Sequence, residues 1–169
     1  MIGHDDSIQG CVHGMYIQTD DSIGALTMDI ILFCDIDGTL CVIDESAPKP
    51  QTDAEWRTTF ANAKPRPEVI SYVRKLQQSS VSKTIIFTGR WEDNRVVTVK
   101  WLRDQGIQYD ELMMRPNGDT RENVVVKMSM LIDALKRNPT MQPTVIDDDN
   151  DVIRACGYIG ISAKDANSI

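Results

Sequence analysis

The sequence predicts an α/β fold in which a parallel central sheet lies between two layers of helices, and three observations lead to this class. Short apolar runs alternate with helical patterns from Met28 onwards. Such an alternation is typical of parallel strands joined by right-handed helical crossovers, in a three-layer α/β/α arrangement. Polar residues directly follow several of the apolar runs. The 169 residues fit one domain of ordinary size.

The first half of this fold is expected to contain two strands and two helices. The patterns place them at 30–35, 67–76, 84–90 and 96–106. Pro67 suits the first position of a helix, and Gly106 suits a C-terminal stop. In the second helix, Val99 and Leu102 are expected to face inward.

The second half is expected to contain three strands, one long helix and one short helix. The patterns place the strands at 111–116, 143–147 and 158–162, the long helix at 119–138, and the short helix before the last strand. Asp119 and Glu122 form an Asp-x-x-Glu capping pattern at the start of the long helix. Val124, Met128, Leu131 and Leu135 share one apolar stripe on it.

The domain organisation predicted from these patterns is simple. Residues 1–27 are rich in Gly, Ser, Asp and Thr without a clear period, so we expect a flexible N-terminal arm. Residues 28–169 form the domain. Within it, the segment at about 41–65 is short and should form a small cap or flap, which leaves the site beneath it open to a polymer end.

Composition limits the classes of partner and compartment. Eighteen basic against twenty-five acidic residues give a net charge of −7, so contact with nucleic acid should be local and not spread over a broad basic surface. The four cysteines lack a C-x-x-C spacing, which favours free thiols in a reducing compartment. No window of about 18 apolar residues occurs. We therefore expect a soluble protein of the cytoplasm.

Polar side chains follow three of the predicted strands. They are Asp35 and Asp37 after the first, Thr88, Gly89 and Arg90 after the second, and Asp147 and Asp148 after the fourth. In an open parallel sheet, ligands bind outside the carboxyl ends of the strands. These residues should therefore meet at one edge.

Two carboxylates so close together need a cation or a proton between them. Asp35 and Asp37 point to the same side of the chain, and Gly38 allows a sharp turn just beyond them. A magnesium ion would relieve their repulsion. One carboxylate can then attack a phosphorus atom while the other donates a proton to the departing oxygen. For Asp149 and Asp151, ordinary helix capping remains an equal alternative.

A calcium loop of the helix-loop-helix type is the competing reading of the acidic run that begins at Asp147. Such a loop requires Gly at its sixth position and Glu at its twelfth. Val152 and Tyr158 occupy those positions. The calcium loop is therefore excluded.

These motifs resemble, in order, the four motifs of the haloacid dehalogenase (HAD) superfamily of phosphotransferases, whose fold is Rossmann-like. The matching residues are Asp35-x-Asp37-Gly38-Thr39, Thr88-Gly89-Arg90, Lys127 and Asp147-Asp148. The resemblance implies an aspartyl-phosphate mechanism with Asp35 as nucleophile, Asp37 as general acid and base, Thr88 on the phosphoryl group and Lys127 neutralising charge. It also implies Mg²⁺ held by the Asp35 carboxylate, the Asp37 carbonyl and the last motif. Asp148 is favoured over Asp147 as the direct ligand.

The stretches WRTTF, PRPEVI, TGR and LMMRPNGDTRENVVVK are similar to the phosphatase domain of bacteriophage polynucleotide kinase and its stand-alone phage relatives. This closer resemblance implies a hydrolase that removes 3′-phosphates from nucleic-acid ends in repair, in the host cytoplasm if the chain is phage-encoded. The kinase P-loop pattern is absent from the sequence. Asn123 stands where at least one family member has an acidic residue.

Other residues near the motifs have two interpretations each. Gly89, Arg90, Arg115 and Arg121 are candidate substrate contacts, with Arg90 suited to a second phosphate oxygen. Asp119 is a further candidate contact, and helix capping is an equal alternative for it. Trp56 and Phe60 are expected to pack in the cap and not to stack on bases.

Three functions follow in order of preference. The first is a Mg²⁺-dependent phosphomonoesterase acting on 3′-phosphate ends of nucleic acid. The second is a nucleotidase acting on free nucleoside monophosphates, which needs the same catalytic residues. The third is a non-catalytic phosphate-binding module. The choice between DNA and RNA and the oligomeric state are left open.

Overall fold

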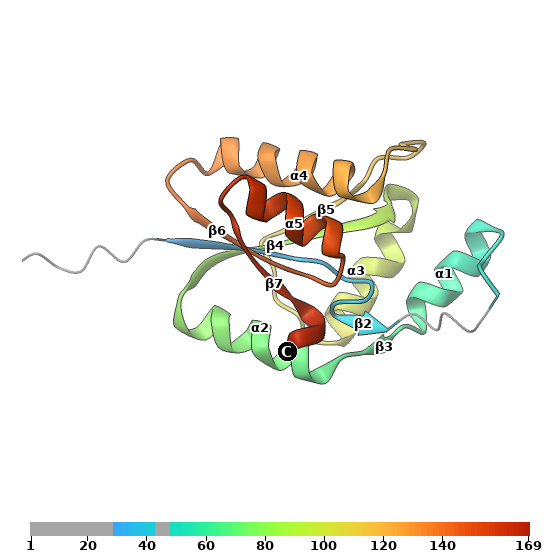
Figure 1. The fold of residues 1–169 in the computed structure, drawn as a ribbon. Helices are drawn as coiled ribbons and strands as arrows, with labels where there is room; N and C mark the ends of the chain where they lie inside the picture. The colour runs from blue at the N-terminus through green and yellow to red at the C-terminus, as the bar shows by residue number, and fades with distance from the viewer. Residues whose placement is uncertain (1–28, 43–47) are drawn as a thin grey trace, which may run out of the picture.

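Five parallel strands form the centre of the computed structural model, which describes residues 29–42 and 48–169 (Figure 1). The strands are β1 (Ile30–Cys34), β4 (Val81–Trp91), β5 (Glu111–Arg115), β6 (Gln142–Asp147) and β7 (Ser162–Asp165). Their order in the sheet is β5-β4-β1-β6-β7, and every neighbouring pair is parallel. The arm expected at 1–27 lies outside the described residues.

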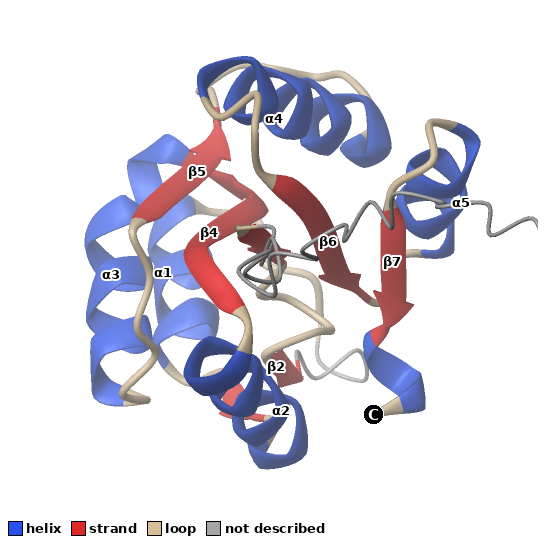
Figure 2. Ribbon diagram, turned by 90° about the vertical axis from the view of Figure 1, so that its left-hand side faces the viewer, coloured by secondary structure: helices blue, strands red, loops and turns tan. Residues whose placement is uncertain are grey.

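Helices cover both faces of this sheet (Figures 1 and 2). They are α2 (Pro67–Ser79) and α3 (Arg95–Asp104) on one face, and α4 (Asn123–Arg137) and α5 (Asn150–Tyr158) on the other. Side chains of β1 alternate between the two: Leu32 and Cys34 belong to the core under α2 and α3, whereas Ile31 and Phe33 belong to the core under α4 and α5. The predicted three-layer fold is confirmed.

The strand order reverses beside β1. Helix α2 leads from β1 to β4 on one face, whereas α4 crosses the other face from β5 to β6. β1 therefore lies between β4 and β6, and the carboxyl ends of β1 and β6 flank the switch point at which ligands bind in open α/β sheets.

Between β1 and α2 the chain leaves the sheet for a segment at about 41–65, which is called the excursion below. Strand β2 (Cys41–Val42) pairs antiparallel with β3 (Lys64–Pro65), so the excursion begins and ends at one place. Between them lies α1 (Asp53–Ala61), which begins with a capping box in which Thr52 and Glu55 satisfy each other's backbone N–H groups. Its buried side chain, Phe60, faces the body of the domain.

Three expectations from the sequence are wrong, two about where an element begins and one about a buried side chain. The last strand begins at Ser162 and not at 158, because Gly160 has a φ of +74° and turns the chain after α5. The long helix begins at Asn123, because Asp119 accepts from the Arg121 backbone N–H in the preceding loop and caps nothing. In α3, Val99 is 37% exposed, whereas Leu102 is buried as expected.

Two short 3₁₀ turns complete the described elements, Glu92–Asn94 after β4 and Ala166–Ser168 at the end of the chain.

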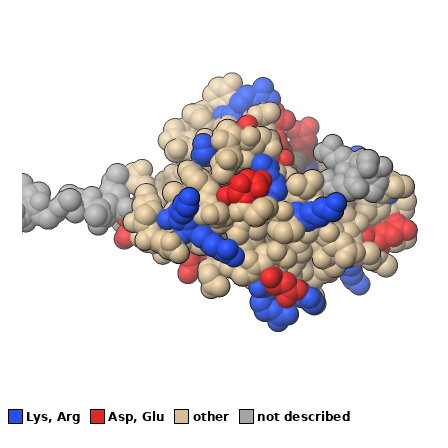
Figure 3. Space-filling model, turned by 90° about the horizontal axis from the view of Figure 1, so that it is seen from below, with Lys and Arg blue, Asp and Glu red and all other residues tan. Residues whose placement is uncertain are grey.

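Figure 3 shows basic and acidic side chains interspersed on one face of the molecule. None of the helices in the described part of the chain is both long and apolar enough to cross a membrane.

Candidate active site

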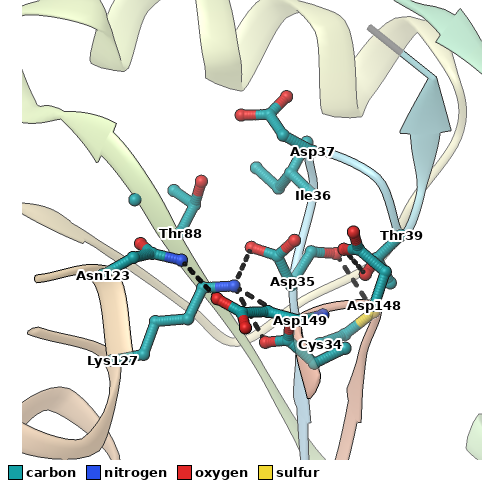
Figure 4. A network of polar contacts seen from close by, with 12 residues as sticks. Cys34, Asp35, Ile36, Asp37, Thr39, Thr88, Asn123, Lys127, Asp148 and Asp149 are labelled. Carbon is teal, nitrogen blue, oxygen red and sulfur yellow. Dashed lines mark hydrogen bonds and ion pairs between the residues drawn. The ribbon is translucent and has the colours of Figure 1, made fainter. Parts of the chain in front are cut away.

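Asp35, the first residue after β1, lies at the centre of a cluster of charged side chains (Figure 4). Its backbone N–H donates to the Ile146 carbonyl of β6 over 3.0 Å, which continues the sheet to this residue. Asp35 is 2% exposed. One oxygen, Oδ1, lies 2.9 Å from Lys127 Nζ, while Oδ2 is buried and has no hydrogen-bond partner among the described residues.

The surroundings of Asp35 disfavour its negative charge. Burial raises its pKa to about 8, with Lys127 lowering it and the carboxylates of Asp147 and Asp37 raising it further. A carboxylate in this position needs more positive charge than Lys127 alone supplies.

Lys127 projects from α4 into the same cluster and is itself 2% exposed. Its ammonium donates to both oxygens of Asp147, over 2.8 and 3.1 Å, besides its contact with Asp35. Burial alone would lower the pKa of Lys127, but the charges of Asp35 and Asp147 outweigh that effect, so the pKa is raised. Lys127 is therefore a fixed positive charge between the ends of β1 and β6.

Asp148 completes an acidic group with Asp35 and Asp147. One carboxylate oxygen from each lies within 4.8 Å of the others, which is a spacing that suits a shared metal ion. The Thr39 hydroxyl donates to Asp148 over 2.9 Å. Gly38 has a φ of +87°, and a Cβ there would lie 2.1 Å from Asp148 Oδ2, so only glycine leaves room for this carboxylate.

Asp149 and Asp151 serve helix α5. The Asp149 carboxylate accepts from the Asp151 backbone N–H over 2.9 Å and so caps the helix, as one of the two interpretations expected. Asp149 also accepts from the Asn123 amide over 3.3 Å.

Asp37 is paired with Arg90. The guanidinium donates to both carboxylate oxygens, Nε over 2.8 Å and Nη2 over 2.5 Å. Arg90 is 3% exposed, donates to Thr98 over 3.3 Å and lies 4.0 Å above the Phe60 ring. Arg90 was expected at a phosphate oxygen, but here its guanidinium holds Asp37.

Thr88 and Gly89 lie next to Arg90 on β4. Thr88 is fully buried, and its hydroxyl accepts from the Arg90 backbone N–H over 3.2 Å, which leaves its own hydrogen for another acceptor. A Cβ at Gly89 would lie 2.4 Å from Asn123 Oδ1, so glycine permits the first residue of α4 to approach the strand.

Neither Arg115 nor Arg121 has a hydrogen bond or ion pair with Asp35, Lys127, Asp147 or Asp148 in the described structure. Arg115 is 9% exposed, and its guanidinium donates to the carbonyls of Gly89, Asp119 and Arg121 and to the Asn123 side chain. It holds together the loop that leads into α4. Arg121 is exposed and pairs with Asp119, which lowers the pKa of that carboxyl to about 2. Neither arginine lines the pocket described next.

A pocket of about 540 Å³ opens above the cluster, between the sheet edge and α1. Three of the catalytic candidates, Asp35, Asp37 and Lys127, line it, together with Arg90, a candidate substrate contact. The rest of its lining comes from the excursion, the end of β4 and the start of α4, namely Gln51, Thr52, Asp53, Trp56, Phe60, Gly89, Trp91, Asn94 and Asn123.

Several of the residues that build this site were not assigned a role from the sequence. The Thr39 hydroxyl donates to Asp148, and Thr39 lies inside the first motif, so the motif alone could have marked it as a residue of the site. Arg66 donates to the Gly38 carbonyl over 2.6 Å and to the Ala166 carbonyl over 3.1 Å, which ties the turn after β1 to the C-terminal segment. No local pattern marks that contact, because its partners are 28 and 100 residues away.

Comparison with known proteins gives one family match. The model of the polynucleotide kinase PNKP phosphatase domain (HAD_PNKP) matches residues 29–167. No curated protein matches the chain.

Solved structures share the fold. A chain of the Pnkp1/Rnl/Hen1 complex is 21% identical with a TM-score of 0.69, covering 83% of this chain and 46% of its own length. In the Pnkp1/Rnl/Hen1 RNA repair complex the identity and TM-score are the same, and the match covers 43% of that chain. The chain thus spans less than half the length of these two proteins. A HAD family enzyme from Bacteroides thetaiotaomicron, solved with magnesium and inorganic phosphate, is 9% identical with a TM-score of 0.51, covering 81% of this chain and 93% of its own.

Proposed function

Because the chain belongs to the PNKP phosphatase domain family of the HAD superfamily, we propose that it is a magnesium-dependent phosphomonoesterase that removes 3′-phosphates from nucleic-acid ends. The observation that carries this proposal is the environment of Asp35. Its carboxyl group lines an open pocket, with one oxygen on Lys127 and the other buried without a hydrogen-bond partner in the described part of the chain. A nucleophile and a site for a cation are therefore combined in one side chain.

The residues present fit a magnesium ion. Magnesium prefers oxygen ligands and usually takes one or two carboxylates plus phosphate and water. The unpartnered Oδ2 of Asp35, the carboxylate of Asp148 and the backbone carbonyl of Asp37 would hold it. Asp147 already accepts three hydrogen bonds, two from Lys127 and one from the Asp149 backbone N–H, which supports Asp148 as the direct ligand. When bound, the ion offsets the repulsion between Asp35 and a dianionic phosphate.

In the first step, a carboxylate oxygen of Asp35 attacks the phosphorus atom. A bond forms between that oxygen and phosphorus, and the bond from phosphorus to the sugar 3′-oxygen breaks. Protonated Asp37 gives its proton to the departing oxygen, which leaves as a hydroxyl group. Lys127 and the Thr88 hydroxyl stabilise the charge on the phosphoryl oxygens.

In the second step, water hydrolyses the phosphoaspartate. The Asp37 carboxylate takes a proton from the water as its oxygen attacks phosphorus, and the bond from phosphorus to Asp35 breaks. Inorganic phosphate leaves, and Asp37 is protonated for the next cycle. Because Arg90 binds both Asp37 oxygens, the carboxyl has to turn away from the guanidinium to transfer a proton. Arg90 would then be free to bind a phosphate oxygen.

The excursion at about 41–65 serves as the cap of the domain that spans 28–169. In the described part of the chain, the excursion contributes α1 and the two residues before it to the lining, and the pocket opens to solvent there. This arrangement favours the end of a polymer, whereas an enclosing lid would favour a small metabolite. The interspersed surface charges and the net charge of −7 also favour binding of an end over binding of a long tract.

Turnover of phosphorylated ends tests the proposal. We expect activity on 3′-phosphorylated oligonucleotides to rise over the first few nucleotides and then to plateau. The affinity should fall only shallowly with salt, because the slope follows the number of phosphates neutralised, at about 0.7 per contact for a single strand. Asp35→Asn serves as the inactive control. A strict preference for free 3′- or 5′-monophosphates would replace this proposal with the nucleotidase function.

A further inference from the structure

Two tryptophans line the same pocket as Asp35 and Lys127. Trp56 comes from α1, and Trp91 is the last residue of β4, directly after Arg90. Trp91 is 45% exposed, and the ring pairs found among the described residues, Phe33 with Phe87 and Trp56 with Phe60, do not include it. A large aromatic side chain thus lies at the mouth of the catalytic pocket without a stacking partner in the described fold.

Trp56 packs on Phe60, as the sequence predicted, and it also lines the pocket. We expected Trp56 and Phe60 to pack in the cap, and Phe60 is indeed 5% exposed. Trp56 stacks on Phe60 with ring centroids 5.3 Å apart, but it is only half-buried and also lines the pocket. Trp56 and Trp91 together are called the aromatic wall below.

The size and chemistry of the pocket exceed the needs of a phosphate group. Pockets for whole small molecules measure roughly 300–1,000 Å³, and this one measures about 540 Å³. Besides Asp35, Asp37, Arg90 and Lys127, the polar lining consists of one acidic side chain, Asp53, and of the neutral side chains of Gln51, Thr52, Asn94 and Asn123. A flat aromatic ring with hydrogen-bonding groups at its edge is the kind of ligand that matches such a lining.

We propose that the aromatic wall binds the base of the nucleotide that carries the phosphate, by stacking on Trp91 or Trp56. This inference rests on the proposed function, since it places the phosphate of that nucleotide at Asp35. Stacking on an aromatic side chain tolerates any base, because every base has a π face. The protein therefore recognises a nucleotide end without reading its sequence, and the end has to be unpaired so that the base is free to leave the helix stack.

The two tryptophans contribute differently. Trp56 contacts Phe60, Phe60 lies under Arg90, and Arg90 holds Asp37, so this series of contacts joins the wall to the proposed general acid. Loss of Trp56 should therefore lower kcat as well as raise KM. Loss of Trp91 should act mainly on KM, because its contribution is the stacking contact itself.

The test compares two short single-stranded oligonucleotides that end in a 3′-phosphate and differ only in the terminal nucleotide, adenosine or an abasic sugar. For the unmodified protein we expect kcat/KM to be about tenfold higher with the base, within the range measured for stacking on aromatic side chains. Trp91→Ala and Trp56→Ala should each reduce that ratio severalfold, and Trp91→Phe should retain most of it. Tyr158→Ala is the matched control, because this aromatic is 89% exposed and lies outside the pocket lining. Equal turnover of the two oligonucleotides by the unmodified protein would overturn the proposal, as would an unchanged ratio in both alanine variants.

A binding measurement separates this inference from the proposed function. In Asp35→Asn, the base-bearing oligonucleotide should quench tryptophan fluorescence and the abasic one should not, and replacing both Trp56 and Trp91 by Phe should remove most of the quench. The third tryptophan, Trp101, is 3% exposed and should contribute little. If neither oligonucleotide is hydrolysed by the active protein, the proposed function fails. The quench then decides the inference alone, and equal fluorescence with both ligands refutes it.

Discussion

Replacement of Lys127 by methionine should cost stability as well as activity. The Lys127 ammonium is almost fully buried between Asp35 and Asp147, at 2.9 and 2.8 Å. Methionine fills a similar volume but leaves two buried carboxylates without their counter-charge. Removal of one partner from a buried ion pair typically costs about 3–5 kcal/mol. We expect a loss of this size in the free energy of unfolding at pH 7, measured by urea denaturation in the presence of a chelator.

Lys136→Met is the matched control for this experiment. Lys136 lies on the same helix, its side chain is 74% exposed, and its ion pair with Asp133 spans 3.7 Å. Its replacement should change the unfolding free energy by no more than about 0.5 kcal/mol. If Lys127→Met unfolds at the same urea concentration as Lys136→Met, the buried pair does not carry the stability that the contacts indicate.

The pH dependence of the same variant gives a second check. Burial raises the pKa values of Asp35 and Asp147 in the folded state above those of the unfolded chain. A folded state that binds more protons gains stability as the pH falls from the raised pKa towards the ordinary one near 4. Without metal, the protein should therefore be more stable at pH 5 than at pH 8 through these groups. Lys127→Met should recover part of its loss at pH 5, and magnesium at pH 7 should have a similar effect.

Three further predictions concern the reaction. Activity should disappear with a chelator and return with magnesium, so full turnover in excess chelator would contradict the metal site. Asp35→Asn should abolish turnover while the circular dichroism spectrum stays unchanged, and near-normal rates for this variant would exclude the covalent mechanism. Asp37→Asn should slow turnover by about a hundredfold, which is the usual effect of losing a general acid. Arg90→Ala should lower kcat/KM by at least about tenfold, because it removes the guanidinium that positions Asp37 and that would bind a phosphate oxygen once Asp37 turns away, and a hydrogen bond to a charged group is worth about 1.5–3 kcal/mol. Lys64→Ala on exposed β3 should have little effect, and equal losses would contradict this role of Arg90.

The fold could be predicted because its signals are local. Apolar runs such as 30–34 are long enough to indicate buried strands, and their alternation with helices determines a parallel sheet. The sequence places the last strand too early, whereas it spans Ser162–Asp165. An edge strand needs no apolar run, and the apolar residues just before this strand belong to a turn and to the hydrophobic core. Edge strands are half-exposed and so carry a weaker pattern.

The candidate site could be predicted only in part. The rule that ligands bind at the carboxyl ends of parallel strands was enough to bring Asp35 and Asp147 together. The partner of Arg90 was not accessible to sequence reasoning. An arginine after a strand can bind substrate or a neighbouring carboxylate, and the choice depends on which group lies within reach once the chain is folded. Here Asp37 lies within reach, 53 residues earlier in the chain.

The position of β1 has a consequence for the order in which the molecule would lose its structure. β1 is hydrogen-bonded to a parallel neighbour on each side, whereas β5 and β7 are the outer strands of the sheet. Backbone amides at such outer strands can exchange their hydrogens with solvent through local opening, whereas those of a central strand exchange only when a much larger unit opens. Since Asp35 continues β1 directly, the residue proposed as nucleophile is anchored in the part of the sheet that should be the last to come apart.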